Sequence, residues 1–173
     1  VDDSDCWYFL ECAHIFNRKN PIPRSRYRRM TQQQIWELPT EEPLVEIVAY
    51  CLMPNHFHFL IKETEEGGMS TFMHKLMTAY TMRFNKKYAR SGGLFTRAFR
   101  SKHIADNRYL RQVFSYIHLN PTDLIAEDMK DTDTPLSNED PAVQYKFSSL
   151  PDYMDTKSIR PQHVLLTKAS WNY

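Results

Sequence analysis

Two apolar runs joined by a Pro-Asn pair constrain the fold of this chain more than any other feature of its sequence. They are LVEIVAYCLM, residues 44–53, and HFHFLIK, residues 56–62. Both runs are rich in β-branched and aromatic residues, and the Pro-Asn pair between them is a turn signal, so an antiparallel hairpin is predicted. Side chains alternate along a strand, so His56 and His58 are expected side by side on one face of the second strand.

The rest of the chain reads as helices mixed with this hairpin. Residues 3–16 and 31–38 show helical spacing of apolar residues. A long helix is expected to start with Ser70 as its cap and to run to about Arg90, because aromatic or aliphatic residues recur every fourth position. Residues 94–104, LFTRAFRSKHI, have the pattern of a basic strand. Asp106 is expected to cap a further helix that Pro121 closes. The predicted class is α+β.

Charge is distributed unevenly although the formal net charge is only +1. Residues 18–29 hold six basic residues and no acidic one, and residues 83–111 hold nine basic residues against Asp106 alone. Residues 123–155 reverse the sign, with nine acidic residues against two lysines, and the acidic stretch at 127–141 is expected to be a loop. This asymmetry is typical of a protein that binds a polyanion on one face, although solvated helix and loop surfaces give the same pattern.

The three cysteines, Cys6, Cys12 and Cys51, lie in apolar contexts without the spacing of a metal site. We interpret them as reduced thiols, which predicts a cytoplasmic protein. No apolar run reaches the length of a transmembrane helix, so no membrane partner is expected.

The paired histidines suggest a metal site. A single histidine in a strand is usually a polar group satisfied by its neighbours, but imidazole is also the commonest metal ligand in proteins, and a strand holds two imidazoles at a fixed separation. Further ligands would have to come from elsewhere in the chain. The segment YLRQVFSYIHLNP, residues 109–121, offers candidates because Gln112, Tyr116 and Asn120 recur every fourth residue on one helix face. Alternatively, Tyr116 is a boundary residue and Asn120 a helix C-cap.

Four segments together resemble the REP-associated tyrosine transposases, IS200-like single-tyrosine members of the HUH endonucleases. AYCLMPNHFHFLI contains the histidine-hydrophobe-histidine motif, and YIHLNP resembles the tyrosine helix of that family. MTAYTMRFNKKYARSGGLFTRAFRSKHI is similar to its long helix, glycine turn and basic strand, and KFSSLPDY to its WSS…Y segment, with Phe147 where tryptophan is usual. The resemblance spans residues 1–153, which we expect to form one transposase domain, and leaves 154–173 as a C-terminal tail.

The resemblance implies a ferredoxin-like antiparallel sheet with helices packed on it. It also implies a metal-dependent activity that cuts and rejoins single-stranded DNA at hairpins of palindromic repeats. His56, His58 and Asn120 match the metal ligands, with Mg²⁺ or Mn²⁺ as the metal. Tyr116 matches the catalytic nucleophile, which would form a covalent 5′-phosphotyrosine.

The expected partner is therefore single-stranded or hairpin DNA, held by a monomer or a homodimer in the cytoplasm and associated with the nucleoid. Basic residues in two segments are candidates for DNA contacts, because cations hold phosphates and neighbouring aromatic side chains stack on unpaired bases. These candidates are Arg97, Arg100 and Lys102 in the basic strand, and Arg24, Arg26, Arg28 and Arg29 in a basic loop expected to follow Pro21 and Pro23.

One departure from the family pattern concerns the start of the chain. Family members begin with a strand before the first helix, and residues 1–16 resemble the segment just after it. Without this strand the sheet would expose a hydrogen-bonding edge. Residues upstream of Val1 would then be missing, or the chain would compensate by forming a dimer. Two other functions stay open: a domesticated DNA-hairpin-binding regulator that does not cut, and a plain HUH nickase.

Overall fold

The computed structural model describes residues 1–121, 136–154 and 160–167, and it combines helices with a hairpin, so the predicted α+β class is confirmed. The chain divides into two units. Unit 1 comprises residues 1–46 and 62–102, and unit 2 comprises residues 47–61 and 103–173. The described residues show no helix that is both long and apolar enough to cross a membrane.

The predicted hairpin is formed by strands β1 (Val45–Leu52) and β2 (Phe57–Glu63), the two strands of the described sheet. The turn between them is closed by the backbone N–H of Met53, which donates to the carbonyl oxygen of His56 at 2.8 Å. All but one of the residues of β1 are buried, whereas β2 is mostly half-buried or exposed. The hairpin therefore presents β2 as its accessible strand.

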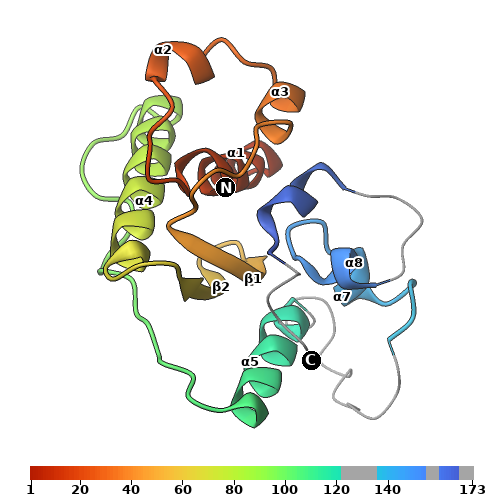
Figure 1. Cartoon of the computed structure of the whole chain (residues 1–173). Helices are drawn as coiled ribbons and strands as arrows, with labels where there is room; N and C mark the ends of the chain where they lie inside the picture. Colours follow the sequence, from red (N-terminus) through yellow and green to blue (C-terminus); the bar gives the residue numbers. More distant parts are fainter. Residues whose placement is uncertain (122–135, 155–159, 168–173) are drawn as a thin grey trace. The chain divides into compact units, whose positions relative to one another are not determined.

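Unit 1 is built from helices α1 (Asp3–Phe16), α2 (Arg24–Tyr27), α3 (Gln32–Trp36) and α4 (Gly68–Lys87), and α1 packs against both α3 and α4 (Figure 1). Asp2 caps α1 and Thr31 caps α3, each in a reciprocal capping box. Where α1 packs on α4, the rings of Phe9 and Tyr80 meet edge to face at 5.1 Å.

Helix α4 begins earlier than the predicted Ser70 cap, because its N-cap is Gly67. Gly67 has φ +76°, in the left-handed region that glycine adopts without strain. A Cβ on Gly68 would lie 2.4 Å from the carbonyl oxygen of Leu44, the residue before β1, so the helix can approach this backbone only with glycine here. The helix also ends at Lys87 rather than near Arg90, since Ala89 turns the backbone left-handed at φ +49°.

Two other local predictions are wrong. The segment after Pro23 is not a loop throughout, because residues 24–27 form the short helix α2. Residues 94–104 do not form the predicted basic strand: they have bends and irregular backbone, and no strand of the described sheet pairs with them. Alternation of polar and apolar residues is therefore not sufficient for a strand when no partner strand pairs with it.

Unit 2 contains helices α5 (Asn107–Leu119), α7 (Pro141–Gln144) and α8 (Leu150–Tyr153), followed by the 3₁₀ helix η1 (Pro161–Leu165). The Asp106 cap predicted for α5 is confirmed, because its Oδ1 accepts from the backbone N–H of Tyr109 at 2.8 Å. The apolar side of α5 packs on residues of both strands in one core cluster. That cluster comprises Val48, Ala49, Cys51, Met53, Leu60 and Ile117, with Leu110, Val113 and Phe114 of α5 against it.

In unit 2, segments from later in the chain bond to backbone groups of β1. The N–H of Leu52 donates to Phe147, the N–H of Ser149 donates to Tyr50, and the N–H of Thr167 donates to Ile47, all at 2.9 Å. The expectation of an exposed hydrogen-bonding edge is therefore wrong for these residues of β1. The acidic stretch expected to be a loop and the expected tail lie largely outside the described residues.

In unit 1, the first residue of β1 is paired by a side chain. The amide of Asn17 donates from Nδ2 to the carbonyl oxygen of Val45 at 2.8 Å, and its Oδ1 accepts from the N–H of Val45 at 3.0 Å. Val45 is fully buried and Asn17 nearly so. The side chain supplies the donor and acceptor that a neighbouring strand would otherwise provide.

Replacing Asn17 with alanine is expected to destabilise the protein by about 2–3 kcal/mol, because both backbone groups of Val45 would lose buried hydrogen bonds. Urea unfolding measures the change. The matched control is Asn20→Ala, which removes an exposed bond to Glu42 and should cost under about 0.5 kcal/mol. Equal stabilities for the two variants would show that the Asn17 amide does not hold the strand.

Candidate active site

The structure brings His56, His58, Tyr116 and Asn120 together within unit 2. The imidazole rings of His56 and His58 meet edge to face with centroids 4.9 Å apart. The ring of Tyr116, on α5, lies 5.5 Å from that of His58, and Asn120 Nδ2 is 3.4 Å from His58 Nε2. His58 lies in β2, whereas His56 lies immediately before this strand and not in it as expected. Their spacing of two residues and the helical spacing of Tyr116 and Asn120 place the four side chains in one cluster.

The contacts of both imidazoles are compatible with metal binding. His56 Nδ1 lies 2.7 Å from Asn55 Oδ1, an oxygen that can only accept, so Nδ1 donates this hydrogen bond and Nε2 is the nitrogen left for a metal. His58 Nε2 lies 3.4 Å from Asn120 Nδ2. Burial, and secondarily the neighbouring His56, lowers the pKa of His58, which favours its neutral form.

Tyr116 is exposed, although it sits on a helix whose other side is packed. Its side chain retains 57% of its accessible surface, whereas Asn120 retains 8% and the adjacent Ile117 is buried. A tyrosine on a packed helix normally turns its ring toward the core, as Tyr80 does in α4. The exposed phenol beside a half-buried imidazole is therefore accessible to a ligand from solvent.

A buried hydrogen-bond relay fixes α5 against β1. His118 Nε2 lies 2.7 Å from Ser149 Oγ, which accepts from the backbone N–H of Tyr50 at 2.9 Å and lies 3.2 Å from the carbonyl oxygen of Tyr50. All three bonds are satisfied when His118 Nε2 and the Tyr50 N–H donate to Oγ and the hydroxyl donates to the carbonyl. This relay sets the position of the helix that carries Tyr116 and Asn120.

The aromatic side chain of Tyr153, at the end of α8, makes a second link between the same elements. Its hydroxyl donates to the carbonyl oxygen of Val48 in β1, and its ring meets Phe114 of α5 edge to face at 5.0 Å. His118 packs against both rings, 4.2 Å from Phe114 and 5.6 Å from Tyr153. Ring packing and the hydrogen-bond relay thus both hold α5 in the same position against β1.

The donor set of the site fits a divalent metal with open coordination positions. No group of three or more His, Cys, Asp or Glu residues in the described parts of the chain is arranged to hold a metal. Any metal here would instead rest on the two imidazoles and the Asn120 carboxamide, whose oxygen replaces its nitrogen when the amide is rotated. Imidazole and amide oxygen together suit Mn²⁺, and oxygen from substrate and water would complete the coordination of Mn²⁺ or Mg²⁺.

The predicted DNA-contact residues all lie in unit 1, outside this cluster. Arg97, Arg100 and Lys102 are exposed on irregular backbone. The arginines in and beside α2 are also exposed. They are Arg24, Arg26, Arg28 and Arg29.

Sequence reasoning missed three supporting residues. Asn55, in the turn, orients His56. His118 and Ser149 position α5. The one signal for His118 was its place four residues after Phe114, on the apolar stripe of the helix.

Comparison with protein families gives a match that covers all four residues of the cluster. The family model described as "Transposase IS200 like" matches residues 14–120, which is more than half of the chain and includes His56, His58, Tyr116 and Asn120. The chain belongs to the IS200-like transposase family. Comparison with curated proteins and with solved structures gives no match. Membership of this family implies a transposase activity on DNA. It does not say how this IS200-like transposase binds or cuts its DNA.

The relay predicts a specific dependence of stability on pH. Burial lowers the pKa of His118 to about 3, whereas histidine in an unfolded chain titrates near ~6.5. Below about pH 6.5 the unfolded state therefore binds a proton that the folded state does not, so stability falls as pH falls toward about 3. Between about pH 7 and about pH 5, the wild-type protein should lose about 2 kcal/mol more of its free energy of unfolding than His118→Gln.

Urea unfolding at the two pH values measures this difference. His74→Gln, which removes an exposed histidine of α4, is the matched control and should follow the wild-type pH dependence. Parallel pH profiles for wild type and His118→Gln would show that burial does not hold this histidine neutral in the folded protein.

Proposed function

We propose that this IS200-like transposase cuts and rejoins single-stranded DNA at hairpins of palindromic repeats through a covalent 5′-phosphotyrosine on Tyr116. The observation that carries the proposal is the exposed Tyr116 ring 5.5 Å from His58, whose Nε2 in turn faces the Asn120 amide at 3.4 Å. A tyrosine nucleophile beside two imidazoles is an arrangement that DNA cleavage uses and simple DNA binding does not need.

In the proposed cleavage step, one bond to phosphorus forms while another breaks. The Tyr116 oxygen attacks a phosphodiester phosphorus, the bond to the 3′-oxygen of the preceding nucleotide breaks, and a free 3′-hydroxyl leaves. The phenolic proton passes to a base, and the departing oxygen takes up a proton. The DNA is then joined to the protein through its 5′-phosphate. A second 3′-hydroxyl can reverse the reaction, so that strands are rejoined without an external energy source.

A divalent metal held by His56, His58 and Asn120 would polarise the phosphate and stabilise its developing negative charge. The protein side chains orient this site independently of the metal. Asn55 fixes the tautomer of His56, and the His118–Ser149 relay fixes the helix that carries Asn120 and Tyr116. The small number of protein ligands leaves room for a phosphate oxygen.

The DNA contacts of unit 1 complete the proposal. Arg97, Arg100 and Lys102 are exposed and lie outside any helix or strand. A series of such cations can contact successive phosphates of a DNA backbone. Arg24, Arg26, Arg28 and Arg29 form a second series. The protein acts as a monomer or a homodimer in the cytoplasm, near the nucleoid where its repeats lie. Two alternatives differ from the proposal. A non-cutting regulator would bind hairpins without cleaving them, and a plain nickase would cleave DNA without joining it to a second end.

Tyr116→Phe is expected to abolish the covalent protein–DNA product while binding to a hairpin stays within about twofold, because the variant removes one exposed hydroxyl. A denaturing gel of labelled hairpins incubated with Mn²⁺ measures the product, and fluorescence anisotropy measures binding. Tyr109→Phe, on the same helix, is the matched control and should retain the product. A covalent product that persists in Tyr116→Phe would assign the nucleophile to another residue.

His58→Gln is expected to weaken Mn²⁺ binding at least about tenfold, because it replaces an imidazole ligand and alters the partner of Asn120. Isothermal titration calorimetry without DNA measures this binding, so the result does not depend on activity. The control His103→Gln removes an exposed histidine of unit 2 outside the cluster. Wild-type Mn²⁺ affinity in His58→Gln would exclude His58 as a ligand.

A further inference from the structure

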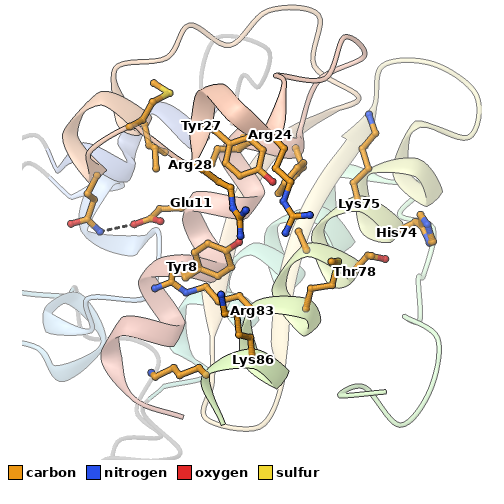
Figure 2. Close-up of a pocket in the computed structure, with 18 residues that line it drawn as sticks. Tyr8, Glu11, Arg24, Tyr27, Arg28, His74, Lys75, Thr78, Arg83 and Lys86 are labelled. Atoms are coloured by element: carbon orange, nitrogen blue, oxygen red, sulfur yellow. Dashed lines mark hydrogen bonds between the residues drawn. The ribbon is translucent and has the colours of Figure 1, made fainter. Parts of the chain in front are cut away.

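Unit 1 contains a large open trough that the active site does not use. It has a volume of about 1270 Å³ and is lined by residues of α1, the segment from α2 to α3, and α4. Figure 2 shows Arg24, Tyr27 and Arg28 on one bank and Arg83 and Lys86 on the other, with Tyr8 and Glu11 of α1 between them. Its volume exceeds the ~300–1,000 Å³ of most small-molecule pockets, which favours a polymeric ligand.

The charge of the trough is strongly positive. Its lining contains one carboxylate, Glu11, and six cationic side chains: Arg24, Arg28, Lys75, Arg83, Lys86 and Lys87. Burial raises the pKa of Glu11, and its Oε1 accepts a hydrogen bond from Gln32 at 2.7 Å, so this single carboxylate already has a partner. The trough is therefore an electrostatic site for an anion.

Several of these cations can reach a ligand. Lys87 is paired with Asp2 and Asp5, and Lys75 donates to the carbonyl oxygen of Arg18. By contrast, Arg24, Arg28 and Lys86 are exposed and form no ion pair with any carboxylate in the described ranges. Cations from α2 and α4 thus face a shared space in which an anionic ligand can bind them.

The interior of the trough is aromatic and apolar. The guanidinium of Arg83 lies 4.1 Å above the ring of Tyr8, and the ring of Tyr27 meets that of Phe16 at 5.7 Å. Met82 is among the lining residues and keeps 55% of its surface exposed. A duplex would present only its phosphates to such a surface, whereas an unpaired base can stack on an aromatic ring or on an arginine plane.

We propose that this trough binds a single-stranded segment of the DNA substrate, with phosphates on the α2 and α4 banks and unpaired bases against the aromatic interior. The inference rests on the proposed function, because the bound segment would be the single-stranded DNA that flanks the hairpin. It separates the seven candidate arginines and lysines of unit 1: Arg24 and Arg28 line the trough, whereas Arg26, Arg29, Arg97, Arg100 and Lys102 do not.

The test measures binding of a labelled oligothymidylate of about eight nucleotides, within the range of single-strand site sizes, by fluorescence anisotropy at several salt concentrations. All proteins carry Tyr116→Phe, so that cleavage does not interfere. Arg24→Gln/Arg28→Gln and Arg83→Gln/Lys86→Gln each remove two positive charges from one bank. Lys19→Gln/Arg90→Gln removes two charges from exposed residues of unit 1 that do not line the trough, and it is the matched control.

Each bank variant is expected to weaken binding at least about tenfold and to reduce the salt slope of log affinity by about 0.7 for each phosphate that the protein no longer neutralises. The control should stay within about twofold of the parent. A duplex of the same length should bind the parent and both bank variants alike. Equal losses in bank variants and control would overturn the inference, and so would equal losses for duplex and single strand.

A covalent-product assay separates this inference from the proposed function. The bank variants are remade with Tyr116 intact and incubated with a hairpin carrying a single-stranded flank. Bank variants that bind oligothymidylate weakly but form the product at saturating DNA support both statements. A different result would separate the two statements: the bank variants bind oligothymidylate weakly, but no protein with an intact Tyr116 forms the covalent product. This result would support single-strand binding in the trough and contradict the proposed function.

Discussion

The rest of unit 2 depends on the burial of β1. A strand with almost every residue buried must pair all of its backbone N–H and C=O groups, because an unpaired buried group costs about 1–3 kcal/mol. Strand β2 satisfies one edge. On Ile47, Tyr50 and Leu52 the pairing comes from residues 147–149 and from Thr167, which are distant in sequence. The same Ser149 that pairs Tyr50 also bonds His118, so the pairing of β1 and the position of α5 are one constraint.

The candidate site follows from that constraint. The start of β2 and the residue before it hold His58 and His56 beside each other. The relay holds α5 so that Asn120 faces His58 and Tyr116 stays exposed. Supporting groups outside the cluster thus set the tautomers and positions of the residues inside it, as the hydrogen-bond partners of metal ligands do. The trough of unit 1 has a different composition, with arginines and aromatic rings and no paired histidines, which suits holding a strand rather than cutting it.

Local patterns predicted the elements, and long-range interactions account for the failures. Period two placed His56 and His58 together, helical spacing placed Tyr116 beside Asn120, and Asp106 was recognisable as a cap. The early start of α4 depends on the approach of Gly68 to Leu44, and the relay joins Ser149 to Tyr50 across 99 residues. Residues 94–104 have a strand pattern but no partner strand in the described sheet. No single segment of sequence contains such information.

The most direct test of the account is the identity of the residue that becomes linked to DNA. The wild-type protein would be incubated with Mn²⁺ and a hairpin from the palindromic repeats near its gene, digested with protease and nuclease, and analysed by tandem mass spectrometry. The account predicts a 5′-phosphorylated nucleotide on Tyr116, in the peptide that contains the α5 sequence SYIHLNP. A nucleotide on any other residue, or an unmodified Tyr116 peptide under conditions where the hairpin is cut, would contradict it.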